Sequence, residues 1–340
     1  MRAVTMERGK LSVCELPDPI PEKGEVLVKS IACGICGSDL HATKHTNDFV
    51  RTSREAGGAF KLTTFDPVVL GHEFCAEIVD YGPSTEKSVV VGSLICSVPM
   101  LLRQPSEAVG YSPNIPGGFG EYMVLSEALI TPVPDGTSAK LAALTEPMAV
   151  GYHAVNKANL NVQDAVLVVG CGPVGLAIII ALKQKGIQPI IAADYSAGRR
   201  KLAETVGADD VFNPAVESPY LHKAIARRKN VVIFECVGVP GMIDDIFLKA
   251  PQNARIIVVG VCLQTDHSRP LIAINKELSI QYVLGYSVDE FVHSLNYISS
   301  GAFDVAPLIT GTTDLTGVAQ AFDDLADPEK HAKILVTPWG

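Results

Sequence analysis

Six consecutive residues, Gly170-Cys171-Gly172-Pro173-Val174-Gly175, restrict the fold of this chain more than any other segment. They follow an apolar run at Ala165–Val169 and lead into a helix-like segment at Val174–Gln184. Glycines at the first, third and sixth positions allow a tight turn in which the backbone approaches a ligand closely. The segment therefore predicts a strand, a glycine turn and a helix in that order.

The same alternation continues along the chain. Further candidate strands are Pro189–Ala193, Val231–Cys236 and Arg255–Val261, and further candidate helices are Ala197–Val206 and Gly241–Lys249. Continuous apolar runs are typical of parallel strands that are buried on both faces. The order predicts an α/β fold with a doubly wound parallel sheet of the Rossmann type.

The first ~145 residues have a different texture, with short apolar runs between Pro- and Gly-rich turns. The candidate strands here are Glu25–Ser30, Val68–Val79, Val89–Ser97 and Glu121–Leu125. This pattern predicts an irregular, mainly antiparallel β-region. Near the end, Ser287-Val288-Asp289-Glu290 has the form of a capping box for a helix that stops at Gly301, and Lys333–Val336 predicts a last strand.

Composition narrows the class of protein. With 47% apolar and 19% charged residues, the chain has the composition of a folded enzyme, and 340 residues suggest two domains. A net charge of −9 without long basic runs argues against a nucleic-acid partner. Met1–Pro17 lacks a secretory signal, and Leu176–Leu182 is too short to span a membrane. Eight cysteines without a disulfide framework favour reduced thiols and a cytoplasmic location.

The glycine turn is of the kind that holds a dinucleotide pyrophosphate at a helix N-terminus. Asp194 ends the next candidate strand, where a carboxylate can bind ribose hydroxyls and repel a 2′-phosphate. This favours NAD over NADP, although Arg199 and Arg200 nearby weaken the preference. The alternative is a glycine-rich turn without a cofactor. The candidate cofactor-binding residues are Gly170, Gly172, Pro173, Val174, Gly175, Asp194, Arg199, Val237 and Val261.

Thiolate, imidazole and carboxylate groups, the ligand types of a catalytic zinc, occur in three separate fragments at Cys36, His72-Glu73 and Glu146. Each residue has an ordinary alternative. Cys36 can be a buried structural thiol or half of a redox pair with Cys33, His72 a core histidine, and Glu146 a carboxylate at a helix start.

Together these fragments resemble one family. Its markers are Gly34-Ile35-Cys36-Gly37-Ser38-Asp39-Leu40-His41, Gly71-His72-Glu73-Phe74, Gly117-Gly118-Phe119-Gly120-Glu121-Tyr122, Glu146-Pro147-Met148-Ala149-Val150 and the glycine turn. Over essentially its whole length the chain is similar to the zinc-dependent medium-chain alcohol dehydrogenases, nearest their sorbitol, butanediol and threonine dehydrogenase-like members. The resemblance implies a GroES-like catalytic domain formed by residues 1–148 and 286–340, and an NAD-binding Rossmann domain at residues 149–285.

The resemblance also implies residue roles. Cys36, His72 and Glu146 occupy the zinc-ligand positions, while Glu73 can enter the site in place of Glu146, and the sequence leaves that choice open. The resemblance gives Asp39 the task of orienting His72. Two further catalytic candidates are Ser38, as hydrogen-bond partner of the substrate oxygen, and His41, as the group that passes the proton to solvent.

The expected reaction is hydride transfer between NAD and a secondary alcohol, diol or polyol, which becomes a ketone. Zinc would act as a Lewis acid that lowers the pKa of the substrate hydroxyl. A threonine-type dehydrogenase is an alternative that needs a cation for the substrate carboxylate, such as Arg51, Arg54 or Lys61. A zinc-free NADPH-dependent quinone or enone reductase and a non-enzymatic dinucleotide-binding protein are less well supported, since neither needs the three ligand-type residues.

Two departures from the family pattern carry expectations. Residues 97–120 contain no cysteine, which predicts one catalytic zinc and no structural zinc. Residues 42–70 form a connection that is longer than in simple alcohol dehydrogenases, and we expect a loop that covers the cleft and shapes substrate choice. We further expect a homodimer or homotetramer, with Glu277–Tyr286 as a place for pairing between subunits.

Overall fold

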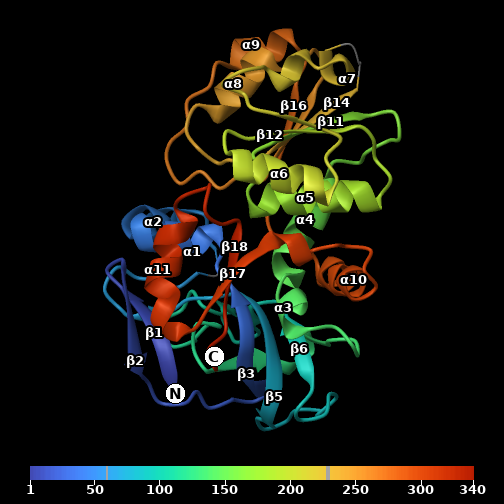
Figure 1. Ribbon diagram of the computed structural model, residues 1–340. Helices are drawn as coiled ribbons and strands as arrows, with labels where there is room; N and C mark the ends of the chain where they lie inside the picture. The colour runs from blue at the N-terminus through green and yellow to red at the C-terminus, as the bar shows by residue number, and fades with distance from the viewer. Residues whose placement is uncertain (59, 227–229) are drawn as a thin grey trace.

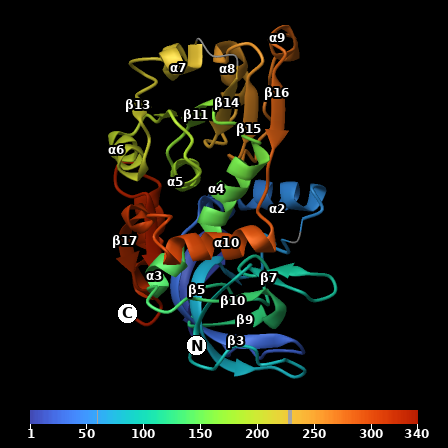
Figure 2. The ribbon, with the colours of Figure 1, turned by 90° about the vertical axis from the view of Figure 1, so that its right-hand side faces the viewer.

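The fold is that of a computed structural model of residues 1–340, which describes all residues except 59 and 227–229. A parallel sheet flanked by helices forms one part of the molecule and mainly antiparallel strands form the other, with helix α4 (Thr145–Lys157) running between them (Figures 1 and 2). The predicted fold class, a Rossmann-type parallel sheet together with a mainly antiparallel β-region, is thereby confirmed.

Among the described residues, six strands form the parallel sheet in the order β13-β12-β11-β14-β15-β16. They are β11 (Ala165–Val169), β12 (Ile190–Ala193), β13 (Asp210–Phe212), β14 (Val231–Glu235), β15 (Arg255–Val258) and β16 (Ser279–Tyr282). The helices around them are α5 (Pro173–Gln184), α6 (Ala197–Val206), α7 (Lys223–Ala226), α8 (Met242–Lys249) and α9 (Pro270–Asn275). Chain order reverses between β11 and β14, which is where ligands bind in sheets of this type.

Both faces of the parallel sheet are buried. Val166 and Val168 of β11 belong to one apolar cluster, and Ala165 and Leu167 of the same strand belong to another. Since successive side chains of a strand point to opposite faces, these clusters lie on the two sides of the sheet. The burial explains why the strands read as uninterrupted apolar runs.

The second part of the molecule contains one large sheet in the order β10-β6-β5-β3-β18-β17, with β9 paired to β3. Its strands are β3 (Glu25–Gly34), β5 (Glu73–Tyr81), β6 (Leu94–Ser97), β9 (Tyr122–Ser126), β10 (Ile130–Pro132), β17 (Ile309–Thr313) and β18 (Lys333–Val336). Smaller sheets hold β1 (Arg2–Glu7), β2 (Lys10–Glu15) and β4 (Val68–Val69), and the pair β7 (Met100–Leu101) and β8 (Glu107–Ala108). Because β18 pairs with β3, the end of the chain lies beside its beginning.

The remaining helices connect and cover these sheets. They are α1 (Gly37–Lys44), α2 (Thr46–Glu55), α3 (Ala139–Ala142), α10 (Val288–Ser299) and α11 (Val318–Leu325). Phe291 and Leu295 of α10 pack in one apolar cluster with Ala149 of α4. The domain boundaries at residues 148/149 and 285/286 remain a prediction, and the first of them falls inside α4.

Several predicted strands were too long. The expected strand Val68–Val79 is β4 and β5, because Gly71 between them has a φ of +102° and packs against Phe119 and Cys33. The expected strand Val89–Ser97 shortens to β6, because Gly92 turns the chain with a φ of +89° and donates its N–H to Ile78.

The end of the parallel sheet also differs from the prediction. The strand expected at Arg255–Val261 ends at Val258, since the N–H groups of Val259 and Gly260 both donate to the Glu235 carbonyl. The run Glu277–Tyr286, expected only as a place for pairing between subunits, contains β16, the last strand of the parallel sheet.

We expected the segment at residues 42–70 to be a loop, but it is partly helical. It contains the end of α1 and the whole of α2, whose residues Phe49 and Val50 are buried. Phe49 stacks on Tyr111 with ring centroids 5.7 Å apart. The insertion is therefore anchored by an amphipathic helix, a pattern hidden in the sequence by the high polarity of the other α2 residues.

Among the described residues, no helix has the length and apolar character needed to cross a membrane.

The predicted capping box forms at the start of α10 and links this helix to α4. The Glu290 carboxylate accepts hydrogen bonds from the Ser287 N–H at 2.9 Å and from Asn156 at 2.8 Å, and it lies 2.7 Å from the His153 ring. Burial alone would raise the pKa of Glu290, but the bonds from Asn156, Ser287 and His153 outweigh it and lower the pKa to about 2. The ionised carboxylate therefore stabilises the contact between the two helices.

We predict that Glu290→Gln lowers the free energy of unfolding at pH 7 by about 1.5 kcal/mol, after allowing for solvent screening of the partly exposed group. A depressed folded-state pKa gives stability that is present above the unfolded value of about 4.5 and is lost as pH falls toward 2. The difference between variant and wild type should accordingly shrink between pH 5 and about 2 in urea denaturation. Glu204→Gln, at an exposed position of α6, serves as the control.

Candidate metal and nucleotide site

Three residues that could ligate a metal meet at one end of β3 and β5. Cys36 follows β3 and caps α1, while His72 and Glu73 stand at the start of β5, and the antiparallel register places Gly34 opposite Glu73. One ligand atom from each of Cys36, His72 and Glu73 lies within 4.8 Å of the other two. Sequence fragments that are far apart in the chain thus supply a single cluster.

The donor set fits zinc. A thiolate, an imidazole and a carboxylate are three of the groups that bind this ion in catalytic sites. His72 is buried, and its Nδ1 atom has no hydrogen-bond partner among the described residues. Burial lowers the pKa of His72, but the negative charges of Asp39 and Cys36 outweigh burial and raise it. The cluster therefore attracts positive charge, as a cation site does.

Lys333 is part of this cluster and was missed by the sequence analysis. Its Nζ donates to the two carboxylate oxygens of Glu73 at 2.8 and 2.6 Å and to the Ile35 carbonyl at 3.0 Å. Both Lys333 and Glu73 are only 1% exposed. The one available signal was a lysine at the start of an otherwise apolar strand, since a buried lysine requires a partner.

Glu146 lies beside the cluster but is not one of its three members. It stands in the first turn of α4. Burial and the neighbouring Glu73 charge raise its pKa to about 7, against the opposing effects of His72, a hydrogen bond with Tyr286, and Lys333. Of the two carboxylates left open by the sequence, Glu73 is thus the one that stands with Cys36 and His72.

Tyr111 contacts two of the predicted catalytic residues of α1, and the sequence did not indicate it as a site residue. Its hydroxyl lies 2.8 Å from Ser38 Oγ and 3.1 Å from Asp39 Oδ1. Asp39 accepts the Cys36 N–H at 2.9 Å, whereas its distance of 3.5 Å to His72 Nδ1 is too long for a hydrogen bond. Across that distance the two groups form an ion pair when His72 is protonated, so Asp39 lies beside the ring that it is predicted to orient, and the orienting role stays a prediction.

His41 stands further along α1. Burial and the charges of His45 and Lys44 lower its pKa. Its ring lies 6.2 Å from that of His45, and within the described parts of the chain no hydrogen bond links it to Ser38. A direct proton path from Ser38 to His41 is not formed by protein groups, so its predicted relay role stays a prediction.

The glycine turn has the geometry that the sequence predicts. Gly170 has a φ of +94°, and a Cβ at Gly175 would lie 1.9 Å from the Gly170 carbonyl oxygen. Pro173 and Val174 open α5 directly after the turn. Only glycine therefore permits this approach of helix to strand.

The other predicted cofactor residues gather at the carboxyl ends of the parallel strands. Asp194 follows β12 and accepts the N–H groups of Cys171 and Ser196, each at 2.8 Å. The Arg199 guanidinium lies beside Gly172, and its buried Nε has no hydrogen-bond partner in the part of the chain that the structure describes. Val237 and Val261, beyond β14 and β15, are 40% and 48% exposed. These residues lie together at the carboxyl ends of the strands, where a nucleotide can bind.

A close helix contact connects the two sites. Helix α4 carries Glu146 in its first turn, beside the metal cluster, and packs on α5, which begins directly after the glycine turn. A Cβ at Gly151 would lie only 2.7 Å from Ala177 of α5. The contact fixes the metal cluster relative to the nucleotide turn.

Two protein-family models match the chain. Residues 22–135 match the alcohol dehydrogenase GroES-like domain, and residues 173–300 match the zinc-binding dehydrogenase model. The chain is 30% identical to (R,R)-butanediol dehydrogenase of Bacillus subtilis, over 99% of this chain and 100% of that protein. It is 28% identical to bovine sorbitol dehydrogenase, over 93% of this chain and 90% of the relative.

A solved structure of an Escherichia coli alcohol dehydrogenase described as short chain, in complex with NADH, superimposes with a TM-score of 0.84. It shares 26% identity with the present chain and covers 99% of each.

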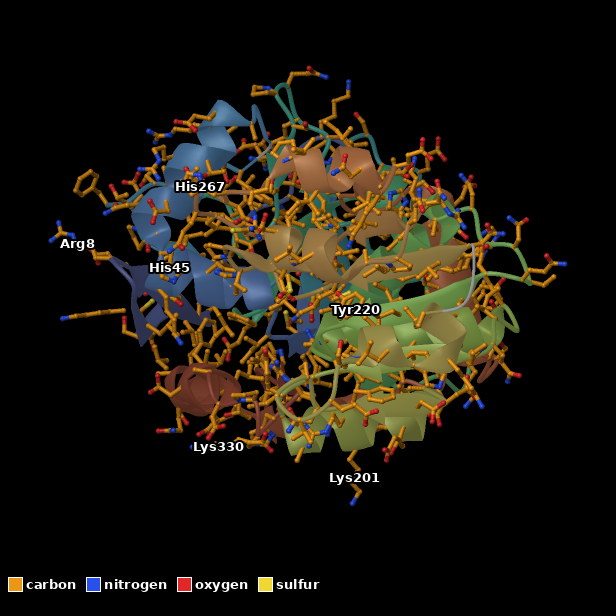
Figure 3. All side chains as sticks on the ribbon, turned by 90° about the horizontal axis from the view of Figure 1, so that it is seen from above. Arg8, His45, Lys201, Tyr220, His267 and Lys330 are labelled. Atoms are coloured by element: carbon orange, nitrogen blue, oxygen red, sulfur yellow. The ribbon has the colours of Figure 1, made fainter. Side chains whose placement is uncertain are left out.

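We predict that Lys333→Met destabilises the protein by about 3 kcal/mol, because it leaves the Glu73 carboxylate buried without a partner. The double variant Lys333→Met/Glu73→Gln should recover part of this loss in denaturant unfolding, since no unpaired charge remains. Lys330→Met is the matched control, since Lys330 lies at the periphery of the molecule with its side chain 54% exposed (Figure 3). Equal stability of Lys333→Met and wild type would contradict the buried ion pair.

Proposed function

The chain belongs to the zinc-dependent medium-chain alcohol dehydrogenases, and on that premise we propose that it transfers a hydride between NAD and a secondary alcohol, diol or polyol, giving a ketone. As a dehydrogenase of this family it acts on CH–OH donors. The substrate class is supported by the relatives, which act on butanediol and sorbitol by name.

The cluster of Cys36, His72 and Glu73 carries this proposal, because it offers ligands to zinc beside a nucleotide turn. Zinc in this place supplies Lewis acidity that lowers the pKa of a substrate hydroxyl. Cys36, His72 and Glu73 would hold the ion, Ser38 would hydrogen-bond the substrate oxygen, and Glu146 would line the site with its carboxyl group. His41, whose pKa is lowered by burial and by His45 and Lys44, would accept the proton and release it to solvent.

NAD is the proposed cofactor in preference to NADP. The Asp194 carboxylate is held in place by two backbone N–H groups at the end of β12. A fixed negative charge there accepts ribose hydroxyls and repels a 2′-phosphate. Solved structures of relatives contain NADH in one case and NADP in another, so the preference for NAD rests on Asp194.

Homo-oligomerisation through β16 is proposed as well. This strand is at the edge of the parallel sheet, and Ile280, Tyr282 and the following Leu284 are 40%, 68% and 90% exposed. An exposed apolar edge strand pairs readily with another chain.

The eight cysteines are free thiols, in keeping with a cytoplasmic location.

Removal of metal tests the proposed reaction. We expect one zinc per subunit, because residues 97–120 offer no thiolates for a second ion. Dialysis against a chelator should reduce alcohol-dependent NADH formation at least ~100-fold, and added zinc should restore it. Metal content and initial rates with NAD and NADP, over a panel of alcohols, diols, polyols and hydroxy-amino acids, provide the measurement.

Two outcomes would contradict this account. Two tightly bound zinc ions per subunit would refute the single site. Reduction of enones with NADPH by the metal-free protein would favour the reductase alternative.

The segment at residues 42–70 is proposed to shape substrate choice. Arg54, Lys61 and Phe60 line a cavity of about 400 Å³. The Phe60 ring lies 4.6 Å from that of Tyr111, which in turn lies 5.2 Å from His72. Phe60 in the cavity lining is thus linked to His72 through the ring of Tyr111, and the cations of Arg54 and Lys61 suit a substrate with a phosphate or carboxylate group.

We predict that Arg54→Ala and Lys61→Ala each raise KM about tenfold for anionic polyols, such as phosphate esters or sugar acids, because each removes one charged partner. KM for neutral polyols should change less than about twofold. Arg51→Ala is the matched control, because Arg51 on the same helix is paired with Asp48 at 2.7 Å. The same effect on neutral and anionic substrates would argue against selection by charge.

A further inference from the structure

Tyr111 has no role in the reaction as outlined above, yet it is buried within the site. Its ring packs against Phe49, Phe60 and His72, and only 2% of the residue is exposed. Packing on three sides fixes the direction of the ring. The hydroxyl is therefore held at one place, between Ser38 and Asp39.

The Tyr111 hydroxyl can donate to either of two neighbouring oxygens. It has one proton, and the acceptors within reach are Ser38 Oγ at 2.8 Å and Asp39 Oδ1 at 3.1 Å. A carboxylate accepts only, whereas a serine hydroxyl both donates and accepts. The Tyr111 proton can therefore turn from one acceptor to the other without movement of any heavy atom.

Each position of the proton gives Ser38 a different property. When Tyr111 donates to Asp39, the Ser38 oxygen is free to accept the O–H of a substrate alcohol. When Tyr111 donates to Ser38, that oxygen is occupied, and the Ser38 proton can point toward a ketone or a deprotonated alcohol. Donation to Ser38 also strengthens its own hydrogen bond, because linked hydrogen bonds polarise one another.

We propose that Tyr111 is a positioning residue that sets the Ser38 hydroxyl as acceptor for the alcohol and as donor for the ketone. The inference rests on the proposed dehydrogenase function. Other protein groups do not offer Ser38 this support, since among the described residues the Ser38 side chain has no other hydrogen-bond partner. Asp39 takes part as the alternative acceptor and is itself fixed by the Cys36 N–H.

The variant Tyr111→Phe tests the proposal, because it removes the hydroxyl and keeps the ring contacts. We expect kcat to fall about tenfold in both directions of the reaction, with KM within about twofold of wild type. A double-mutant cycle with Ser38→Ala identifies the path. If Tyr111 acts through Ser38, the double variant should be no slower than Ser38→Ala alone.

Zinc binding and stability are measured on the same variants. Zinc affinity of Tyr111→Phe, from competition with a chelator, should lie within about threefold of wild type. Tyr220→Phe is the control, since it removes another buried tyrosine hydroxyl. This hydroxyl has no hydrogen-bond partner among the residues outside the gaps at 59 and 227–229, and it lies with the elements of the parallel sheet (Figure 3).

Three results would overturn the inference: an unchanged kcat in Tyr111→Phe, losses that add in the double variant, or a loss of rate that follows a loss of zinc. Each is distinct from failure of the proposed function, in which the zinc-loaded wild type itself oxidises no alcohol with NAD.

Discussion

The register of three strands at Gly34 determines the whole metal cluster. Gly34 pairs with Glu73 of β5 on one side and with Leu335 of β18 on the other. A Cβ at Gly34 would lie 2.2 Å from the Glu73 carboxylate, so only glycine leaves room for that side chain. One pairing brings His72 and Glu73 to Cys36, and the other brings Lys333 to Glu73. A shift of one residue in either pairing would send these side chains to the opposite face.

The nucleotide half depends on a similar absence of side chains. Gly175 lets α5 approach the end of β11, and Gly151 lets α4 approach α5. Because α4 packs closely on α5 and carries Glu146, the carboxyl group beside the metal cluster has a fixed position relative to the glycine turn. The capping box at Glu290 fastens α10 to the same helix, next to Tyr286, the hydrogen-bond partner of Glu146. Small residues and one capped helix thus hold two chemical sites in fixed relation.

Sequence could predict the parts whose signals are local. The buried strands of the parallel sheet, the glycine turn and the capping box each occupy a short stretch with its own periodicity or spacing. Lys333 and Tyr111 were missed because their roles arise from pairing across 260 and 73 positions of the chain. Helix α2 was missed because its buried face consists of few residues in a polar segment. Two strands were predicted too long because a positive φ at Gly71 and at Gly92 interrupts a run that looks continuous in sequence.

The buried pair of Glu73 and Lys333 has a consequence for the chemistry of the site. Lys333 offsets the charge of Glu73, so the carboxylate offers oxygen ligands without adding net negative charge. A divalent cation held by one thiolate, one neutral imidazole and this neutralised carboxylate, as we propose, would keep a net positive charge. In a buried site such a charge favours the deprotonated form of an alcohol. Replacing Lys333 by a neutral residue would remove that excess, so under the proposed function the lysine would matter to the reaction as well as to stability.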